Sequence, residues 1–188
     1  MVRAFGPGPV AADRVDHLID LARRAPSAGN SQGTDFLVLD DPAAVARYWD
    51  ATLPEERRAG FRWPGLLVAP VLVVVATRPD AYIERYAEDD KASTGLGASP
   101  DDWPVPYWWV DAGAAVEHLL LGAVDAGLGA CLFGLFDHEA AVADAFDVPP
   151  TYRLVGTVAL GPPAADEPGR SARRPRRPLD EVIHRSRW

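Results

Sequence analysis

The chain has 188 residues, of which 48% are hydrophobic and 24% are charged, and its formal net charge is −8. This length and balance predict one globular domain with its own hydrophobic core and exclude disorder over the whole chain. The negative charge argues against a general role in binding nucleic acid or anionic membranes. The single cysteine, Cys131, excludes an intrachain disulfide and a cysteine metal cluster, which suits a reducing compartment.

The first half of the chain predicts helices that alternate with strands. In order, we predict a helix over 10–24, a strand over 36–39, a helix over 43–50, a strand over 70–76 and a helical segment over 79–90. The first helix carries apolar residues at helical spacing, and Pro26 ends it. The strand over 70–76 is rich in valine and apolar at every position, which is typical of a central strand buried on both faces.

The second half of the chain predicts one long helix and two further strands. In order, we predict a loop over 92–106, a helix over 107–127, a strand over 130–133, a helix over 138–146 with Asp137 as its cap, and a strand over 152–160. The long helix is apolar on nearly every side, so it either belongs to the core or is shared with a partner subunit. Interleaved helices and strands of this kind indicate one α+β domain over residues 1–188.

A cationic segment lies near the end of this acidic chain. Five arginines and no acidic residue fall within residues 170–177. Such a cluster is typical of a phosphate site, because guanidinium groups bind phosphate oxygens in pairs, but it is equally typical of a solvated basic tail. Residues 162–178 are rich in proline and have no evident place to pack on their own subunit. We therefore expect the extension 162–188 to pack on a partner subunit.

Two short segments have the composition of ligand-binding loops. Residues 25–32 read APSAGNSQ, and their backbone amides together with Ser, Asn and Gln side chains can satisfy a planar heterocycle with several acceptors. On local chemistry alone, an ordinary polar loop is the favoured interpretation of this segment. Gly134 follows a predicted strand, where it either lets the backbone approach a ligand or marks a tight strand exit.

Four segments in a fixed order carry a resemblance to a known family. They are RAFGPGPV at 3–10, APSAGNSQ at 25–32, the apolar helix from DAG at 111–113 to AGLG at 126–129, and RPRRPLDEV at 174–182. In this arrangement the chain resembles the nitroreductase family over most of its length. The loop with the pattern Ala-Pro-Ser-x-x-Asn-Ser-Gln is the most specific part of the resemblance.

The resemblance implies a nitroreductase-like three-layer α+β fold, with a central mixed, mostly antiparallel sheet flanked by helices. It also implies a homodimer with flavin mononucleotide (FMN) in two shared sites and a C-terminal segment that reaches across to the partner. For the FMN phosphate it implies Arg3, Arg174 and Arg176. For the flavin ring or ribityl chain it implies Pro26, Ser27, Asn30 and Gln32, with both subunits contributing. Near the flavin N5 it implies a backbone amide at Phe133 and Gly134, and it implies Leu132 as a further cofactor-binding residue.

The activity implied by the resemblance is the reduction of nitroaromatics, quinones or similar electron-poor acceptors with NADH or NADPH. The flavin would carry the chemistry in a ping-pong mechanism, so no side chain is expected to act as a catalytic acid or base. One alternative is a protein of the same fold that binds or stores a flavin or deazaflavin without turnover. A second alternative, an arginine tail that contacts nucleic acid, is opposed by the acidic remainder of the chain.

The segment from Trp103 to Trp109 is unusually aromatic. As a hypothesis, Trp103 or Tyr107 shapes the acceptor pocket by stacking on a flat acceptor. The alternative, which we favour, is hydrophobic packing at the mouth of the long helix. A further local feature is Gly33-Thr34, which stands where the family often has Pro-Trp. We expect this departure to alter flavin packing or the floor of the substrate site.

Targeting and metal-binding signals are weak in this sequence. The first residues hold no apolar stretch of signal-peptide length, and charged residues interrupt the most apolar helix, so we expect a cytoplasmic protein with no membrane span. The four histidines have no metal-ligand spacing, so we expect no metal. Cys131 lies in an apolar predicted strand and is expected to be a buried thiol.

Overall fold

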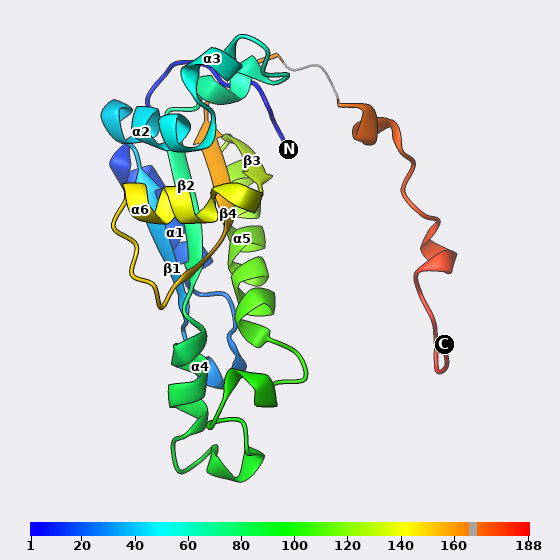
Figure 1. The fold of residues 1–188 in the computed structure, drawn as a ribbon. Coiled ribbons are helices and arrows are strands. Elements are labelled where there is room, and N and C mark those ends of the chain that lie inside the picture. Colours follow the sequence, from blue (N-terminus) through cyan, green and yellow to red (C-terminus); the bar gives the residue numbers. More distant parts are fainter. Residues whose placement is uncertain (166–168) are drawn as a thin grey trace.

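The computed structural model describes residues 1–165 and 169–188 (Figure 1). Its helices are α1 (Ala12–Ala22), α2 (Pro42–Thr52), α3 (Glu55–Arg58), α4 (Pro79–Tyr86), α5 (Tyr107–Asp125) and α6 (Glu139–Ala145). Its strands are β1 (Thr34–Leu39), β2 (Val71–Thr77), β3 (Gly129–Phe133) and β4 (Arg153–Gly161). Each helix and strand predicted from the sequence is present, with ends that shift by a few residues. None of the described helices is both long and apolar enough to span a membrane.

The four strands form a sheet in the order β1-β2-β4-β3. Val73, at the centre of β2, pairs with Val38 of β1 and with Val158 of β4. All pairings between these described strands are antiparallel, so the sheet is antiparallel throughout and not mixed as expected. Strand direction depends on the long-range path of the connections, which neither valine content nor periodicity reports.

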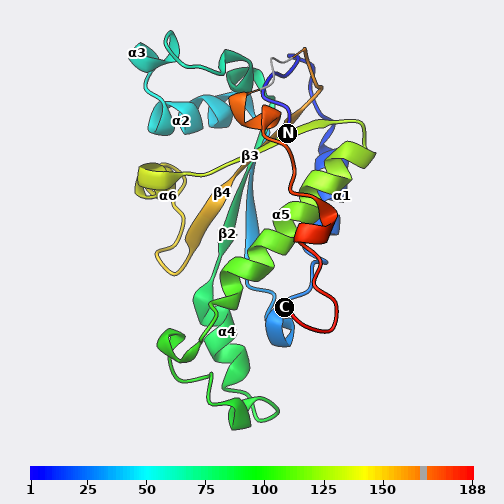
Figure 2. The same cartoon turned by 90° about the vertical axis from the view of Figure 1, so that its right-hand side faces the viewer.

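Helices cover both faces of the sheet and give the fold three layers (Figure 2). α2 and α6 lie on one face, and α1 and α5 lie on the other. All seven residues of β2 are buried. Leu72 and Val74 pack in the core beneath α2 and α6, whereas Val71 and Val73 pack against α1 and α5. This alternation confirms both the predicted central strand and the predicted three-layer α+β fold.

A small lobe extends from one end of the sheet (Figure 1). It consists of α4 and the loops that follow it, and we call residues 78–106 the α4 lobe. Its core is aromatic, because Tyr82 and Trp103 pack edge to face with centroids 6.0 Å apart, and Trp108 of α5 lies 6.0 to 6.1 Å from both rings. Trp103 Nε1 also donates a hydrogen bond to the Leu96 carbonyl at 2.9 Å. The lobe therefore has a core of its own beside the two cores of the sheet.

The start of α6 differs from the prediction. Asp137 is not the cap of this helix, because it lies in a preceding 3-10 turn, Phe136–His138. His138 holds the N-cap position and makes no side-chain capping bond. The backbone at Phe136 has a positive φ of 48°. The helix therefore begins after this turn, at Glu139.

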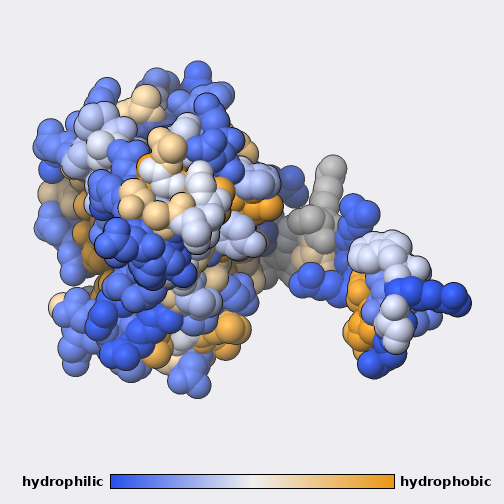
Figure 3. All heavy atoms as spheres, turned by 90° about the horizontal axis from the view of Figure 1, so that it is seen from below, coloured by the Kyte–Doolittle hydropathy of each residue, from blue (hydrophilic) through white to orange (hydrophobic). Residues whose placement is uncertain are grey.

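The tail (residues 169–188) lies apart from the main body of the subunit (Figure 1). At its start Gly169 lies against Trp63, since a Cβ placed on this glycine would be 3.3 Å from the indole. Further along, apolar side chains face solvent, with Leu179 71% exposed and Trp188 99% exposed. Figure 3 shows an apolar patch on this segment. The placement fits the expectation that the tail packs on a partner subunit, which stays a prediction.

Candidate functional site

The ten residues predicted to bind FMN line three hollows of one subunit. The first hollow, about 410 Å³ in volume, is lined by Arg3, Leu132, Phe133 and Gly134. The second, about 510 Å³, is lined by Pro26, Ser27, Asn30 and Gln32. The third, about 640 Å³ and formed by the tail, is lined by Arg174 and Arg176. These three hollows share no lining residue, so one subunit gathers the predicted residues into three sets and does not unite them.

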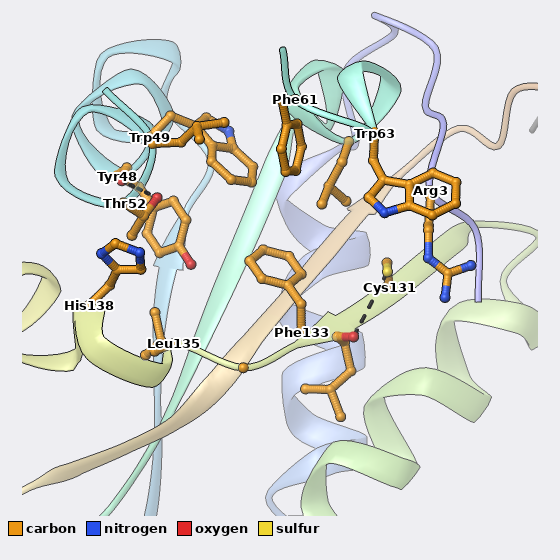
Figure 4. A pocket seen from close by; sticks show the side chains of 14 residues that line it. Arg3, Tyr48, Trp49, Thr52, Phe61, Trp63, Cys131, Phe133, Leu135 and His138 are labelled. Carbon is orange, nitrogen blue, oxygen red and sulfur yellow. Dashed lines mark hydrogen bonds between the residues drawn. The ribbon is translucent and has the colours of Figure 1, made fainter. Parts of the chain in front are cut away.

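The first hollow has aromatic walls (Figure 4). The indole of Trp49 on α2 and the ring of Phe133 on β3 stack with centroids 5.9 Å apart and planes inclined by 14°. Phe61 and Trp63, from the segment between α3 and β2, line the hollow as well. The guanidinium of Arg3 lies over the Trp63 ring, 5.0 Å from its centroid. The hollow therefore combines flat apolar surfaces with a cation, which suits a flat ring that carries an anionic group.

Two residues of α2 that the sequence analysis did not select also border this hollow. Tyr48 Oη lies 2.8 Å from Thr157 Oγ1, and both residues are buried. Burial raises the pKa of Tyr48 to about 12, so the phenol stays neutral near neutral pH. Trp49 Nε1 is buried and has no hydrogen-bond partner among the described residues. An aromatic pair on a helix is most often core, so the sequence holds no signal that would single these residues out.

Cys131 lines the first hollow between Arg3 and Phe133 (Figure 4). It is 3% exposed, which confirms the prediction of a buried thiol. The strand β3 that carries it alternates its side chains between the two cores, so Cys131 and Leu132 belong to opposite faces of the sheet.

The second hollow is built around a loop with an uncommon backbone conformation, which we call loop 26–32. Gly29, Asn30 and Gln32 have φ angles of 60°, 57° and 52°. Residues other than glycine adopt such angles only where their surroundings hold them. Within the loop, the Gln32 amide donates to Ser27 Oγ at 3.0 Å. Pro26, Asn30 and Gln32 are exposed, so the loop directs its polar side chains outwards.

Two charged residues from other elements hold loop 26–32 in place. Asp111 of α5 accepts a hydrogen bond from the Ala28 amide at 2.8 Å. Arg85 of α4 donates from Nε to the Gly29 carbonyl at 2.9 Å. From the sequence, Asp111 is a charge that interrupts an apolar helix and the first residue of the DAG segment at 111–113, and no role at the loop was predicted for it. A lone carboxylate on an otherwise apolar helix face is the signal that could have identified it, because buried charges need partners.

The aromatic residues of α4 pack directly on this loop and on the residue after it. A Cβ placed on Gly33 would lie 2.6 Å from the Tyr82 ring and 3.1 Å from the Arg78 carbonyl oxygen. A Cβ on Gly29 would lie 2.7 Å from the Tyr86 ring. No larger residue fits at either position without movement of α4. The departure from Pro-Trp at 33–34 therefore accompanies close packing of a tyrosine against the loop.

Three neighbouring arginines of the tail differ in their surroundings. Arg177 is engaged within the tail, since it donates to the Glu181 carboxylate at 3.3 Å and to the Glu181 carbonyl at 2.7 Å. Arg174 and Arg176 are exposed and make no hydrogen bond or ion pair to any residue that the structure describes. The two tail arginines among the three predicted to bind phosphate thus differ from their neighbour Arg177 in being directed to solvent. Arg170 and Arg173 belong to the 3-10 turn at the start of the tail.

A comparison with known families establishes the relationship of this chain. The model of the Nitroreductase family matches residues 1–162. The chain belongs to the nitroreductase family. The matched region contains the sheet, loop 26–32 and the first hollow, while the tail lies beyond it. The family resemblance predicted from the four sequence segments is confirmed.

Relatives across this family differ in their names. A protein of Archaeoglobus fulgidus named "Putative NADH dehydrogenase/NAD(P)H nitroreductase" is 24% identical over 190 residues, which cover 100% of this chain and 92% of that protein. A 5,6-dimethylbenzimidazole synthase of Rhodospirillum rubrum is 29% identical over 183 residues, which cover 89% of this chain and 79% of that protein. The solved structure of an FMN-dependent nitroreductase from Clostridium difficile R20291 has 17% identity and a TM-score of 0.67, and the match covers 100% and 94% of the two chains. At this identity the structural likeness establishes the fold alone.

In this nitroreductase-family chain, the two residues of the acceptor-pocket hypothesis have different surroundings. Trp103 is 7% exposed and belongs to the core of the α4 lobe, so its packing role is evident. Tyr107 begins α5 and is 43% exposed, with its ring centroid 6.2 Å from that of Trp103. Neither residue lines any of the three hollows described above. Their contact with an acceptor stays a prediction.

Proposed function

We propose that this protein is an FMN-dependent oxidoreductase that works as a homodimer, with one FMN in each of two sites shared between the subunits. The observation that carries the proposal is the division of the ten predicted residues among three hollows. A second copy of the chain can bring loop 26–32 of one subunit against the first hollow of the other. The tail, which has little to pack on in its own subunit, can then add its arginines to the phosphate end.

The chemistry of the residues present fits FMN. The stacked aromatic residues of the first hollow match a flat, largely apolar ring system, and Gly134 is exposed and has no side chain between its amide and a ligand. Loop 26–32 offers hydroxyl and amide groups for polar ring atoms and ribityl hydroxyls. Arg3, Arg174 and Arg176 supply the forked donors that bind phosphate best.

Bound FMN would supply the redox chemistry, accepting electrons from NADH or NADPH and passing them to an electron-poor acceptor such as a nitroaromatic or quinone. The residues of the chain bind and orient the ring and exclude water from its buried face. Burial raises the pKa of Tyr48, beside the first hollow, to about 12, so its phenol stays neutral at physiological pH. Because donor and acceptor would use the same face in turn, we expect ping-pong kinetics.

The test is spectroscopic and kinetic. The full chain is purified, supplied with FMN and freed of excess, and its flavin absorbance and molar mass in solution are measured. We expect two FMN per dimer, bleaching of the flavin absorbance on anaerobic addition of NADH or NADPH, and parallel double-reciprocal lines with a nitroaromatic or a quinone. A monomer that fails to retain FMN supplied in excess contradicts the proposal.

Two other outcomes would redirect the assignment. A dimer that binds FMN but is not reduced by either nicotinamide supports the flavin or deazaflavin storage alternative. A protein that is reduced but does not turn over nitroaromatics or quinones acts on another class of acceptor. Family membership alone does not decide between these, because one relative is named as a synthase and a fold hosts many functions.

A further inference from the structure

We infer that Asp111 is a positioning residue that holds loop 26–32 in its ligand-binding conformation and links it mechanically to the α4 lobe. Asp111 is 8% exposed, and among the side chains whose burial the structure describes (residues 1–165, 169 and 172–188) it is the only charged one that is buried. A buried carboxylate is unfavourable unless hydrogen bonds compensate it, so its presence in the apolar helix α5 requires a structural reason. The part of the inference that concerns FMN rests on the proposed function.

Two hydrogen bonds from distant parts of the chain converge on one oxygen of this carboxylate. The Ala28 amide donates to Asp111 Oδ2 at 2.8 Å, and Tyr82 Oη donates to the same oxygen at 2.9 Å. Burial of Tyr82, and after it the hydrogen bond to Asp111, raise the pKa of the phenol, which therefore remains a donor. An ionised acceptor binds such donors more strongly than a neutral one. Asp111 is thus a single point at which loop, helix and lobe are joined.

The loop needs such an anchor because of its backbone. Asn30 and Gln32 are not glycines, yet both have positive φ angles, a conformation that costs free energy and persists only when neighbouring structure enforces it. Asp111 holds the loop at the Ala28 amide, and Arg85 holds it at the adjacent Gly29 carbonyl. Arg85 is itself oriented by two bonds of 2.7 Å to the Asp90 carboxylate. The two anchors act on the peptide groups Ser27–Ala28 and Gly29–Asn30, at the start of the segment with positive φ angles.

Through Tyr82, Asp111 is also connected to the core of the α4 lobe. The Tyr82 ring packs edge to face on Trp103 and Trp108, and it lies directly against Gly33. A ligand that immobilises loop 26–32 therefore also restrains Tyr82 and, through it, the aromatic core of the lobe. We expect FMN binding at the loop to slow amide hydrogen exchange in α4, even at residues that do not line the second hollow.

The test compares D111A, D111N and Y82F in the full chain, with FMN affinity from fluorescence titration and loop order from hydrogen exchange measured by mass spectrometry. We expect D111A to weaken FMN binding by about tenfold or more, as loss of a charged acceptor does, and to speed exchange across residues 28–32. D111N keeps an oxygen acceptor without the charge and should weaken binding by about threefold. At saturating FMN, the turnover rate of D111A with NADH or NADPH and a quinone should equal the wild-type rate, because Asp111 does not touch the reacting atoms.

Y82F tests the link to the lobe. This variant keeps the ring packing and the bond between Asp111 and Ala28 but removes the hydroxyl. We expect near wild-type exchange at residues 28–32 and a clear loss of the FMN-induced protection of α4. Full protection of α4 in Y82F overturns the link.

D41A is the matched control. Asp41 also accepts a hydrogen bond from a backbone amide, that of Ala44 at 3.1 Å, but it caps α2 and lies outside both hollows that hold the loop and Arg3. It should lower stability and leave FMN affinity unchanged. The inference is overturned if D111A folds and has wild-type FMN affinity and wild-type loop exchange. If D111A does not fold, D111N decides: wild-type values in both measurements overturn the inference.

Failure of the wild-type protein to bind FMN would refute the proposed function. Loop exchange in the apo variants would still decide the role of Asp111.

Discussion

Loop 26–32 and the tail are both expected to contact one FMN, yet their own subunit stabilises them to different degrees. The loop is held from three sides by Asp111, Arg85 and Tyr86, and its strained backbone is kept in one conformation. The tail carries exposed apolar residues, presents Arg174 and Arg176 to solvent, and makes few contacts with the body of the subunit. The comparison suggests that one half of the proposed site is formed before assembly, and the other half is ordered by the partner subunit.

The largest effect that would sharpen this comparison is expected in the tail. In R174A/R176A, FMN affinity should fall by about 100-fold, because each charge-assisted bond to phosphate contributes about tenfold. Stability without FMN should not change, since neither arginine bonds to a described residue. FMN fluorescence titration and thermal unfolding of the apo protein measure the two quantities.

The matched control for that double variant is R185A/R187A, which removes the same charge further along the tail. It should change FMN affinity by less than about threefold at physiological salt, where distant charges are screened. If both double variants weaken FMN binding equally, the tail acts only through its overall positive charge. The tail would then hold no defined half of the site, and the comparison with loop 26–32 would fail.

A smaller effect, which lowers the stability of the apo protein, is expected beside the loop. In G33A the new Cβ meets the Tyr82 ring and the Arg78 carbonyl, so the free energy of unfolding should fall by about 2 kcal/mol, as in other overpacked sites. FMN affinity should fall as well, because the backbone at Gly33 must shift away from the Tyr82 ring and moves the adjoining loop 26–32 with it. Urea denaturation of the apo protein gives the first quantity.

G60A serves as the control for this variant. A Cβ on Gly60 would lie 3.9 Å from the Arg57 carbonyl oxygen, an ordinary contact, so stability should change by about 0.5 kcal/mol at most. If G33A is as stable as wild type, α4 does not pack on the loop as tightly as the contacts indicate.

The smallest effect is expected at a site that belongs to neither region. Glu139 at the start of α6 forms two bonds to Arg153 and accepts one from the Leu154 amide. The bond to Arg153 is the main cause that lowers the pKa of Glu139 below its ordinary value of 4.5. At pH 7 E139Q should lower the free energy of unfolding by about 1 kcal/mol and leave FMN affinity unchanged.

The sign of the pH dependence follows from the direction of that pKa shift. A carboxyl whose pKa is lowered by folding stabilises the protein above its unfolded pKa, and this contribution is lost as the pH falls through the lowered value. The difference in unfolding free energy between wild type and E139Q should therefore be constant from pH 6 to pH 8 and shrink below 4.5. Urea denaturation at several pH values checks this, and a difference that grows in acid would contradict it.

Much of the local structure could be predicted from the sequence because its causes are local. The all-apolar run of β2 predicts burial on both faces, and the spacing of Val15 and Leu18 predicts α1. The order of four short motifs identified the family, and the family in turn indicated which residues to compare. Asp137 was wrongly predicted as a cap because the positive φ at Phe136 starts the helix one step later.

The sequence by itself therefore determined the elements, the α+β class, the family and the set of residues proposed to bind FMN. Only the tertiary structure decided that those residues fall into three separate hollows, that the sheet is antiparallel, and that Asp111 supports Ala28 from 83 positions away. The physical reason is that periodicity and turn chemistry act over a few residues, whereas a buried charge finds its partners through the packing of the whole chain.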